Sequence, residues 1–171
     1  MKNAKLIIDG KEIEVKINEE DLKKLTTTTN NKITGYERVN GGYYYYDNGY
    51  TVDTILDTGN PTSVDLYDVA NYYSNINIAN NNARADRLMR QLRRFAVENR
   101  KADIDWDDET QYKYFIYYYY ESNELRIQSV SSCSFRDFGQ IYFDMKETAE
   151  LAIEKFKDEL LWYFTEYRDS L

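Results

Sequence analysis

The sequence predicts an α+β protein with a small N-terminal ββα module followed by two βββα-like units, which have antiparallel sheets and packed amphipathic helices. Three observations predict this fold class. Alternating apolar residues open the chain, a run of four tyrosines occurs twice, at 43–46 and 117–120, and each run precedes an aromatic pair and a long amphipathic segment. We place the module at 1–30, the first unit at 31–101 and the second unit at 102–171.

The N-terminal module begins with two alternating segments between Lys5 and Ile17. They are joined at 9–10 by Asp-Gly, which is a favoured two-residue hairpin turn. Asn18 then supplies an N-cap for a short helix over 19–25, with acidic residues in its first turn and lysines in its last. The polar segment 26–31 is predicted to be a linker.

The first unit is predicted to end in a long helix over 78–99. Its apolar residues share one arc at 100° per residue, which indicates a helix with one buried side: Ala85, Leu88, Met89, Leu92, Phe95 and Ala96. Before this helix we expect a strand pair over 36–46 broken at 40–42, a strand over 50–56, a loop over 57–63 and a short strand over 69–73.

The second unit is predicted to follow an acidic connector over 101–110. We expect strands over 112–120, 125–130 and 139–143, and then a final helix capped by Asp144, with Glu147 completing a capping box. The apolar face of this helix is predicted to be Ala149, Ala152, Ile153, Phe156, Leu160, Tyr163, Phe164 and Tyr167. The helix of the first unit is rich in arginine, whereas the final helix is acidic.

The charge and the missing residue types exclude several classes of function. The formal net charge is −8, which argues against general nucleic-acid binding and favours either solubility or a basic partner. The chain has no histidine, so a Ser–His or Cys–His pair and a Cys/His zinc site are excluded, and an enzyme is less expected than a binding protein. No cofactor is predicted.

The cellular compartment is predicted from the cysteine count and the hydropathy pattern. Cys133 is the one cysteine, so an intramolecular disulfide is excluded and a reducing compartment is indicated. No apolar stretch reaches the length of a signal peptide core or a membrane span. We therefore expect a cytoplasmic protein without a membrane partner.

The first candidate site is the arginine-rich helix. Guanidinium groups on its exposed arc match phosphate oxygens, and these residues are predicted to bind phosphate or a partner: Arg84, Arg87, Arg90, Arg93 and Arg94. The alternative is a solvated helix face that the acidic segments of the same protein neutralise.

The second candidate site lies in the tyrosine run of the second unit. Strand alternation places Tyr118 and Tyr120 on the same face, where exposed rings would stack on bases or anchor a protein. The alternative is that they pack in the core of the sheet.

The acidic connector is a weaker candidate. The alternating aspartates at 103, 105 and 107 lack the glycine and the closing glutamate of a calcium loop. We predict no metal here and expect Ile104 and Trp106 to point inward.

Two segments carry a resemblance to a known group of proteins. The hairpin sequence from Lys5 to Val15, and the sequence from Phe138 to Phe143 followed by Ala149 and Ile153, resemble small proteins encoded by phages and prophages of Gram-positive bacteria. Such sets include anti-CRISPR and other counter-defence proteins.

This resemblance implies a non-catalytic inhibitor of a bacterial defence system, most simply an anti-CRISPR protein that binds a CRISPR nuclease effector and blocks its interaction with nucleic acid. The implied partner is a host defence protein or ribonucleoprotein, with the arginine helix contacting RNA or an acidic patch. A binder that sequesters a phosphorylated or nucleotide signal, an RNA- or DNA-binding regulator and a carboxylate- and metal-dependent enzyme remain alternatives. Whether the two units pack within one chain or form a homodimer stays open.

Overall fold

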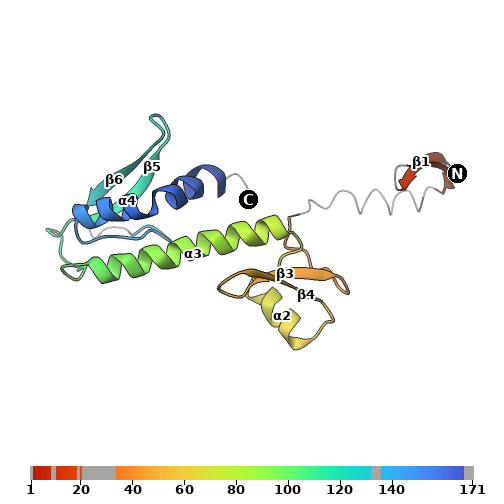
Figure 1. Cartoon of the computed structure of the whole chain (residues 1–171), viewed down its shortest axis with the longest axis horizontal. Helices are drawn as coiled ribbons and strands as arrows, with labels where there is room; N and C mark the ends of the chain where they lie inside the picture. Colours follow the sequence, from red (N-terminus) through yellow and green to blue (C-terminus); the bar gives the residue numbers. More distant parts are fainter. Residues whose placement is uncertain (1, 9–10, 19, 21–33, 132–135, 168–171) are drawn as a thin grey trace. The chain divides into compact units, whose positions relative to one another are not determined.

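The computed structural model describes residues 2–8, 11–18, 20, 34–131 and 136–167. The chain divides into two compact units, Met1–Glu37 and Arg38–Leu171 (Figure 1). The described residues form antiparallel two-stranded sheets and α-helices, so the predicted α+β class is confirmed.

The first compact unit contains the predicted N-terminal hairpin. Strand β1 (Lys2–Ile8) pairs antiparallel with β2 (Lys11–Ile17), in a register that sets Ile8 opposite Lys11. The turn at 9–10, the linker over 26–31 and, apart from Glu20, the predicted helix over 19–25 lie outside the described residues.

The second compact unit contains two further hairpins and the long helices. Its elements are β3 (Tyr43–Asp47), β4 (Val52–Leu56), α2 (Pro61–Asp68), α3 (Ile76–Asn99), β5 (Lys113–Tyr119), β6 (Glu124–Val130), α4 (Lys146–Trp162) and the π-helix η1 (Tyr163–Tyr167). Strand β3 pairs with β4 and β5 pairs with β6, both antiparallel. The two hairpins are thus separate sheets.

Each of these hairpins gains one bridging residue on its free edge. Tyr45 exchanges two backbone hydrogen bonds with Tyr73, at 2.8 and 2.9 Å, and Tyr114 does the same with Phe143, at 2.9 and 2.7 Å. The strands predicted over 69–73 and 139–143 therefore shrink to one residue each. In the first case the cause is Ala70, whose φ of 57° interrupts an extended backbone.

Helix α2 occupies part of the segment that the sequence analysis assigns to a loop. Asn60 caps it by accepting a hydrogen bond from the Ser63 backbone N–H at 2.9 Å, and Pro61 stands at its first position, where a missing N–H costs nothing. The predicted strand before residue 40 is also absent from the structure. There the Val39 N–H donates to the Tyr72 hydroxyl at 2.9 Å instead of to a neighbouring strand.

Helix α3 has the buried face that its periodicity predicts. It lies along α4, whose other side contacts the β5–β6 hairpin (Figure 1). The core between them consists of Leu88, Leu92, Phe95, Ile116, Phe143, Ala149, Ala152 and Leu160. The N-terminus of α3 is capped by Asn75, whose side chain accepts hydrogen bonds from the N–H groups of Asn77 and Ile78.

Helix α4 begins differently from the prediction. Met145 is its N-cap and makes no side-chain cap, so the predicted capping box is wrong. The Asp144 carboxylate turns away and accepts hydrogen bonds from the backbone N–H groups of Lys101 and Ala102, at 2.6 and 3.0 Å. Asp144 therefore ties the segment that follows α3 to the start of α4.

Removing a core side chain from α3 tests this packing. We expect Leu88→Ala to lower the free energy of unfolding by about 2–5 kcal/mol, because Leu88 is 2% exposed and its loss leaves a cavity. Leu151→Ala removes the same atoms from a side chain that is 53% exposed and should change it by about 0.5 kcal/mol or less. Urea unfolding measures both, and equal losses would contradict the assigned core.

Candidate binding site on helix α3

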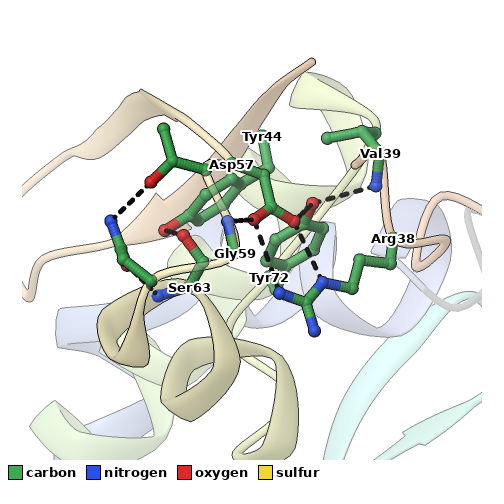
Figure 2. Close-up of polar contacts among 9 residues, drawn as sticks. Arg38, Val39, Tyr44, Asp57, Gly59, Ser63 and Tyr72 are labelled. Carbon is green, nitrogen blue, oxygen red and sulfur yellow. Dashed lines mark hydrogen bonds and ion pairs between the residues drawn. The ribbon is translucent and has the colours of Figure 1, made fainter. Parts of the chain in front are cut away.

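The position of the β3–β4 hairpin is set by the carboxylate of Asp57, which is 1% exposed (Figure 2). It accepts hydrogen bonds from Arg38 Nε at 3.0 Å and Nη2 at 3.4 Å, from the Tyr72 hydroxyl at 2.9 Å and from the Gly59 N–H at 2.8 Å. This one side chain therefore joins the end of β4 to two other segments, those of Arg38 and Tyr72, and closes the turn at Gly59.

The aromatic rings next to Asp57 extend the same network. Tyr72 stacks on Tyr44 with ring centroids 4.0 Å apart and planes 13° apart. The Tyr44 hydroxyl reaches Ser63 Oγ in α2 at 3.4 Å, as Figure 2 shows. Hairpin, α2 and the segment before α3 are thereby packed as one piece.

The charge state of Asp57 follows from these contacts. The hydrogen bonds from Arg38, and then from the Gly59 N–H, lower the pKa of Asp57 from its ordinary 3.8 to about 2. Burial raises the pKa of Tyr72. Because both carboxylate oxygens already accept hydrogen bonds, we assign Asp57 a structural role and not that of a general base.

Arg84, at the start of the predicted arginine set, contacts α4 and is only partly exposed. Its Nε and Nη2 contact the two carboxylate oxygens of Glu159 at 2.7 and 3.0 Å, and its Cζ lies 3.9 Å from the centroid of the Trp162 ring. The hydrogen bonds from Arg84 lower the pKa of Glu159. Arg84 therefore fastens α3 to α4.

Arg87 and Arg90 are exposed and face the loop that joins β3 to β4. Arg87 Nη2 donates to the Tyr50 carbonyl oxygen at 2.8 Å. Arg90 Nη2 lies 3.8 Å from Asp47 Oδ2, which is an ion pair beyond hydrogen-bond distance. These arginines form one wall of a groove whose other wall is the hairpin loop.

The groove consists of two adjoining depressions of about 640 and 620 Å³ that share Arg87 and Gln91. The first continues toward Arg84 and Glu159, and the second contains Tyr50, Arg90 and Arg94. We call the second depression the Tyr50 groove, defined by Gly49, Tyr50, Arg87, Arg90, Gln91 and Arg94.

The last two predicted arginines separate. Arg94 lines the Tyr50 groove, with its Nε 3.7 Å from Glu98 Oε1. Arg93 lines another depression of about 390 Å³ together with Arg136 and Phe138. Three of the five predicted arginines are thus brought together in the Tyr50 groove, and Arg84 and Arg93 are not.

Tyr118 and Tyr120 share a face, as strand alternation requires. Their rings meet edge to face at 4.9 Å, Tyr118 stacks on Phe164 at 6.1 Å, and the Tyr120 hydroxyl donates to the Phe164 carbonyl oxygen at 3.1 Å. Tyr118 is half-buried, whereas Tyr120 is 51% exposed. The pair packs against η1, and neither residue lines the groove next to α3.

The acidic connector folds on itself. Ile104 and Trp106 are half-buried as expected, and Trp106 meets Tyr142 edge to face at 4.9 Å. The buried Lys113 donates to the Asp108 carbonyl oxygen at 2.7 Å. Within the described ranges, no cluster of three or more acidic residues or cysteines has the geometry of a metal site.

Sequence reasoning missed two exposed aromatic residues. Tyr50 is 87% exposed at the tip of the β3–β4 loop, and Phe138 is fully exposed beside an apolar depression of about 360 Å³. The sequence offered one signal for Tyr50, because it directly follows Asp-Asn-Gly, a turn sequence that places the next residue at a loop tip.

None of the helices in the described part of the chain is both long and apolar enough to cross a membrane.

Comparison with protein-family models, curated proteins and solved structures gave no match.

The network around Asp57 predicts a specific pH dependence. Because the pKa of Asp57 is lower in the folded protein, the unfolded chain binds the proton first as the pH falls. The stabilisation is complete above about pH 4 and is lost as the pH falls toward 2. Asp57→Asn should therefore be less stable than the wild type in urea at pH 6, with the difference shrinking between pH 4 and 2.

The exposed Asp68→Asn serves as the control and should follow the wild type throughout. A difference between Asp57→Asn and the wild type that stayed constant from pH 6 to 2 would contradict this role of the carboxylate.

The contact between α3 and α4 predicts a measurable coupling. In a double-mutant cycle of Arg84→Ala and Glu159→Ala we expect about 0.5–1 kcal/mol, because the pair is bidentate but its side chains are 42% and 41% exposed. The longer and more exposed pair of Arg94 and Glu98 should give a coupling near zero. Urea unfolding measures both couplings. Equal values would show that the contact of Arg84 with Glu159 stabilises the fold no more than an exposed surface ion pair does.

Proposed function

We propose that this protein is a non-catalytic inhibitor of a bacterial defence system, of the anti-CRISPR type, that binds a CRISPR nuclease complex and blocks its interaction with nucleic acid. The observation that carries the proposal is the gathering of Arg87, Arg90 and Arg94 along one groove of a chain whose net charge is −8. The resemblance of the sequence to small phage proteins supports the choice of a defence target.

The separation of charge supports binding to a ribonucleoprotein. Such a complex presents a basic protein channel and an acidic RNA together. The acidic part of this protein, which includes the connector over 103–109, would face the basic channel, and the arginines of α3 would face the RNA or an acidic patch. Opposite charges would speed association and make it sensitive to salt.

The loop around Phe138 supports a contact with protein. A fully exposed phenylalanine next to an apolar depression is the kind of residue that anchors protein interfaces. Arg93 and Arg136 lie beside it and would pair with carboxylates of the partner.

We also propose that 31–101 and 102–171 are two copies of one βββα-like unit, and that the protein acts in the cytoplasm of the host cell. The equivalent bridges of Tyr45 with Tyr73 and of Tyr114 with Phe143, each followed by a long helix, support the common unit. The sole cysteine, Cys133, fits a reducing compartment.

Charge reversal in the groove tests the proposal. Purified protein is added to a panel of CRISPR nuclease complexes from Gram-positive bacteria, and DNA cleavage and binding are measured at low and high salt. The wild type should inhibit at least one complex, and Arg90→Glu with Arg94→Glu should weaken binding at least tenfold, because charge-assisted contacts of about 1.5–3 kcal/mol are lost.

Arg100→Glu with Lys101→Glu makes the same change of charge at the end of α3, outside the groove, and should bind like the wild type. The proposal is wrong if no complex is inhibited, or if both double variants lose binding equally.

A further inference from the structure

The Tyr50 groove combines two kinds of side chain that recognise different parts of a nucleotide. Arg87, Arg90 and Arg94 of α3 line one side, and Tyr50, which is 87% exposed, lines the other. Guanidinium forks match phosphate oxygens, and an exposed aromatic ring provides a surface on which a base stacks. The volume of about 620 Å³ is in the range of small-molecule sites.

The loop that carries Tyr50 is held by its own hydrogen bonds. Asn48 Oδ1 accepts from the N–H groups of Tyr50 and Thr51, at 2.8 and 2.9 Å, and Asn48 Nδ2 donates to Asp53 Oδ2 at 2.7 Å. Asp47 Oδ1 accepts from the Gly49 N–H at 2.8 Å, and Gly49 has a φ of 95°, which favours glycine. The backbone below the Tyr50 ring is therefore fixed before any ligand arrives.

The hydrogen bonds that hold this loop do not involve the Tyr50 ring, so they do not explain why an aromatic residue is exposed there. Tyr50 is 87% exposed, so its ring contributes little to the folded core. Arg87 holds the loop through the carbonyl oxygen of Tyr50, a contact that any residue at this position would offer. A tyrosine is thus not required for the loop, and its ring is available to a ligand.

The arginines keep donors for a ligand as well. The hydrogen bond from Arg87 to the Tyr50 carbonyl oxygen uses one of the five N–H donors of the guanidinium group. The carboxylates nearest to Arg90 and Arg94, those of Asp47 and Glu98, lie at 3.8 and 3.7 Å, beyond hydrogen-bond distance. These two acidic groups reduce the local positive charge without occupying the guanidinium hydrogens.

We infer that the Tyr50 groove binds a nucleotide unit, with its phosphate on the arginines of α3 and its unpaired base on the Tyr50 ring. The inference rests on the proposed function, in which α3 contacts RNA, and it names single-stranded RNA as the part contacted. A base in a duplex is already stacked and paired, and its face does not reach the ring. A free nucleotide carries the same chemistry, so the experiment separates the two sources.

The test uses the whole chain of 171 residues and two fluorescently labelled RNA strands of ten nucleotides, one containing only adenine bases and the other only uracil bases. In fluorescence anisotropy at low salt, the wild type should bind both strands, more weakly as salt rises, and bind an RNA duplex less well. Tyr50→Ala should weaken binding roughly 5- to 150-fold, which is the usual effect of losing one stacked base, while Tyr50→Phe should stay close to the wild type.

Two controls separate the groove from general effects. Tyr43→Ala removes a ring that is 66% exposed on the same hairpin, outside the Tyr50 groove, and should leave binding unchanged. Arg90→Ala with Arg94→Ala should weaken binding at least tenfold, whereas Arg100→Ala should not. Arg87 is kept, because its loss would also release the Tyr50 loop.

Thermal unfolding with mono-, di- and triphosphate nucleotides and with cyclic dinucleotides distinguishes the source. A rise of the midpoint that Tyr50→Ala abolishes, without binding of the RNA strands, would keep the nucleotide site and make a free nucleotide its ligand. Equal binding by Tyr50→Ala, Tyr43→Ala and the wild type, or no binding of any nucleotide or strand, would overturn the inference.

The same variants keep this result apart from the proposed function. Nucleotide binding that depends on Tyr50, in a protein that inhibits no nuclease complex, would support the nucleotide site and contradict the proposed inhibitor function. Inhibition by Tyr50→Ala at the wild-type level would leave the inhibitor and remove the groove from its mechanism.

Discussion

The hydrogen-bonded, buried carboxylate of Asp57 is the contact on which the first half of the compact unit Arg38–Leu171 depends. Asp57 directly follows β4. Its partner Gly59 lies in the same loop, whereas Arg38 and Tyr72 come from two other segments. A buried carboxylate without these donors would be costly, so the segments are held together by the need to solvate one charge. Because Tyr72 stands only a few residues before the start of α3, the network also fixes where that helix begins beside the hairpin.

As a consequence, the arginines of α3 make different contacts and have different roles. Helical spacing puts Arg84 against Glu159 and Trp162 of α4, where it contributes to stability. The next arginine, at 87, meets the hairpin loop that the Asp57 network has positioned, and the groove opens between them. One helix thus uses similar side chains first to hold the protein together and then to present positive charge.

The periodicity of apolar residues correctly predicted the features that depend on residues close together in the sequence. The buried face of α3 and the hairpin of β5 with β6 follow from local alternation, and both are found in the structure. Helix α2 was missed because its short polar sequence lacks an apolar period, although Asn60 and Pro61 carried its start signal. The pairing of Arg84 with Glu159 joins residues 75 positions apart, so nothing local distinguishes it from the arginines that stay exposed.

Local sequence patterns also explain why Tyr118 and Tyr120 were predicted to be binding residues and Tyr50 was not. A run of tyrosines in a strand draws notice, yet strand residues bury one face, and Tyr118 packs on Phe164. A single tyrosine in a turn has no strand neighbour of the same kind to pack against. The surroundings of its side chain depend on which element the fold places next to the turn. Here that element is α3, and Tyr50 lines one groove with the arginines of that helix, on a hairpin that the Asp57 network helps to order. The proposed nucleotide site therefore depends on long-range packing, and not on either of the two tyrosine runs.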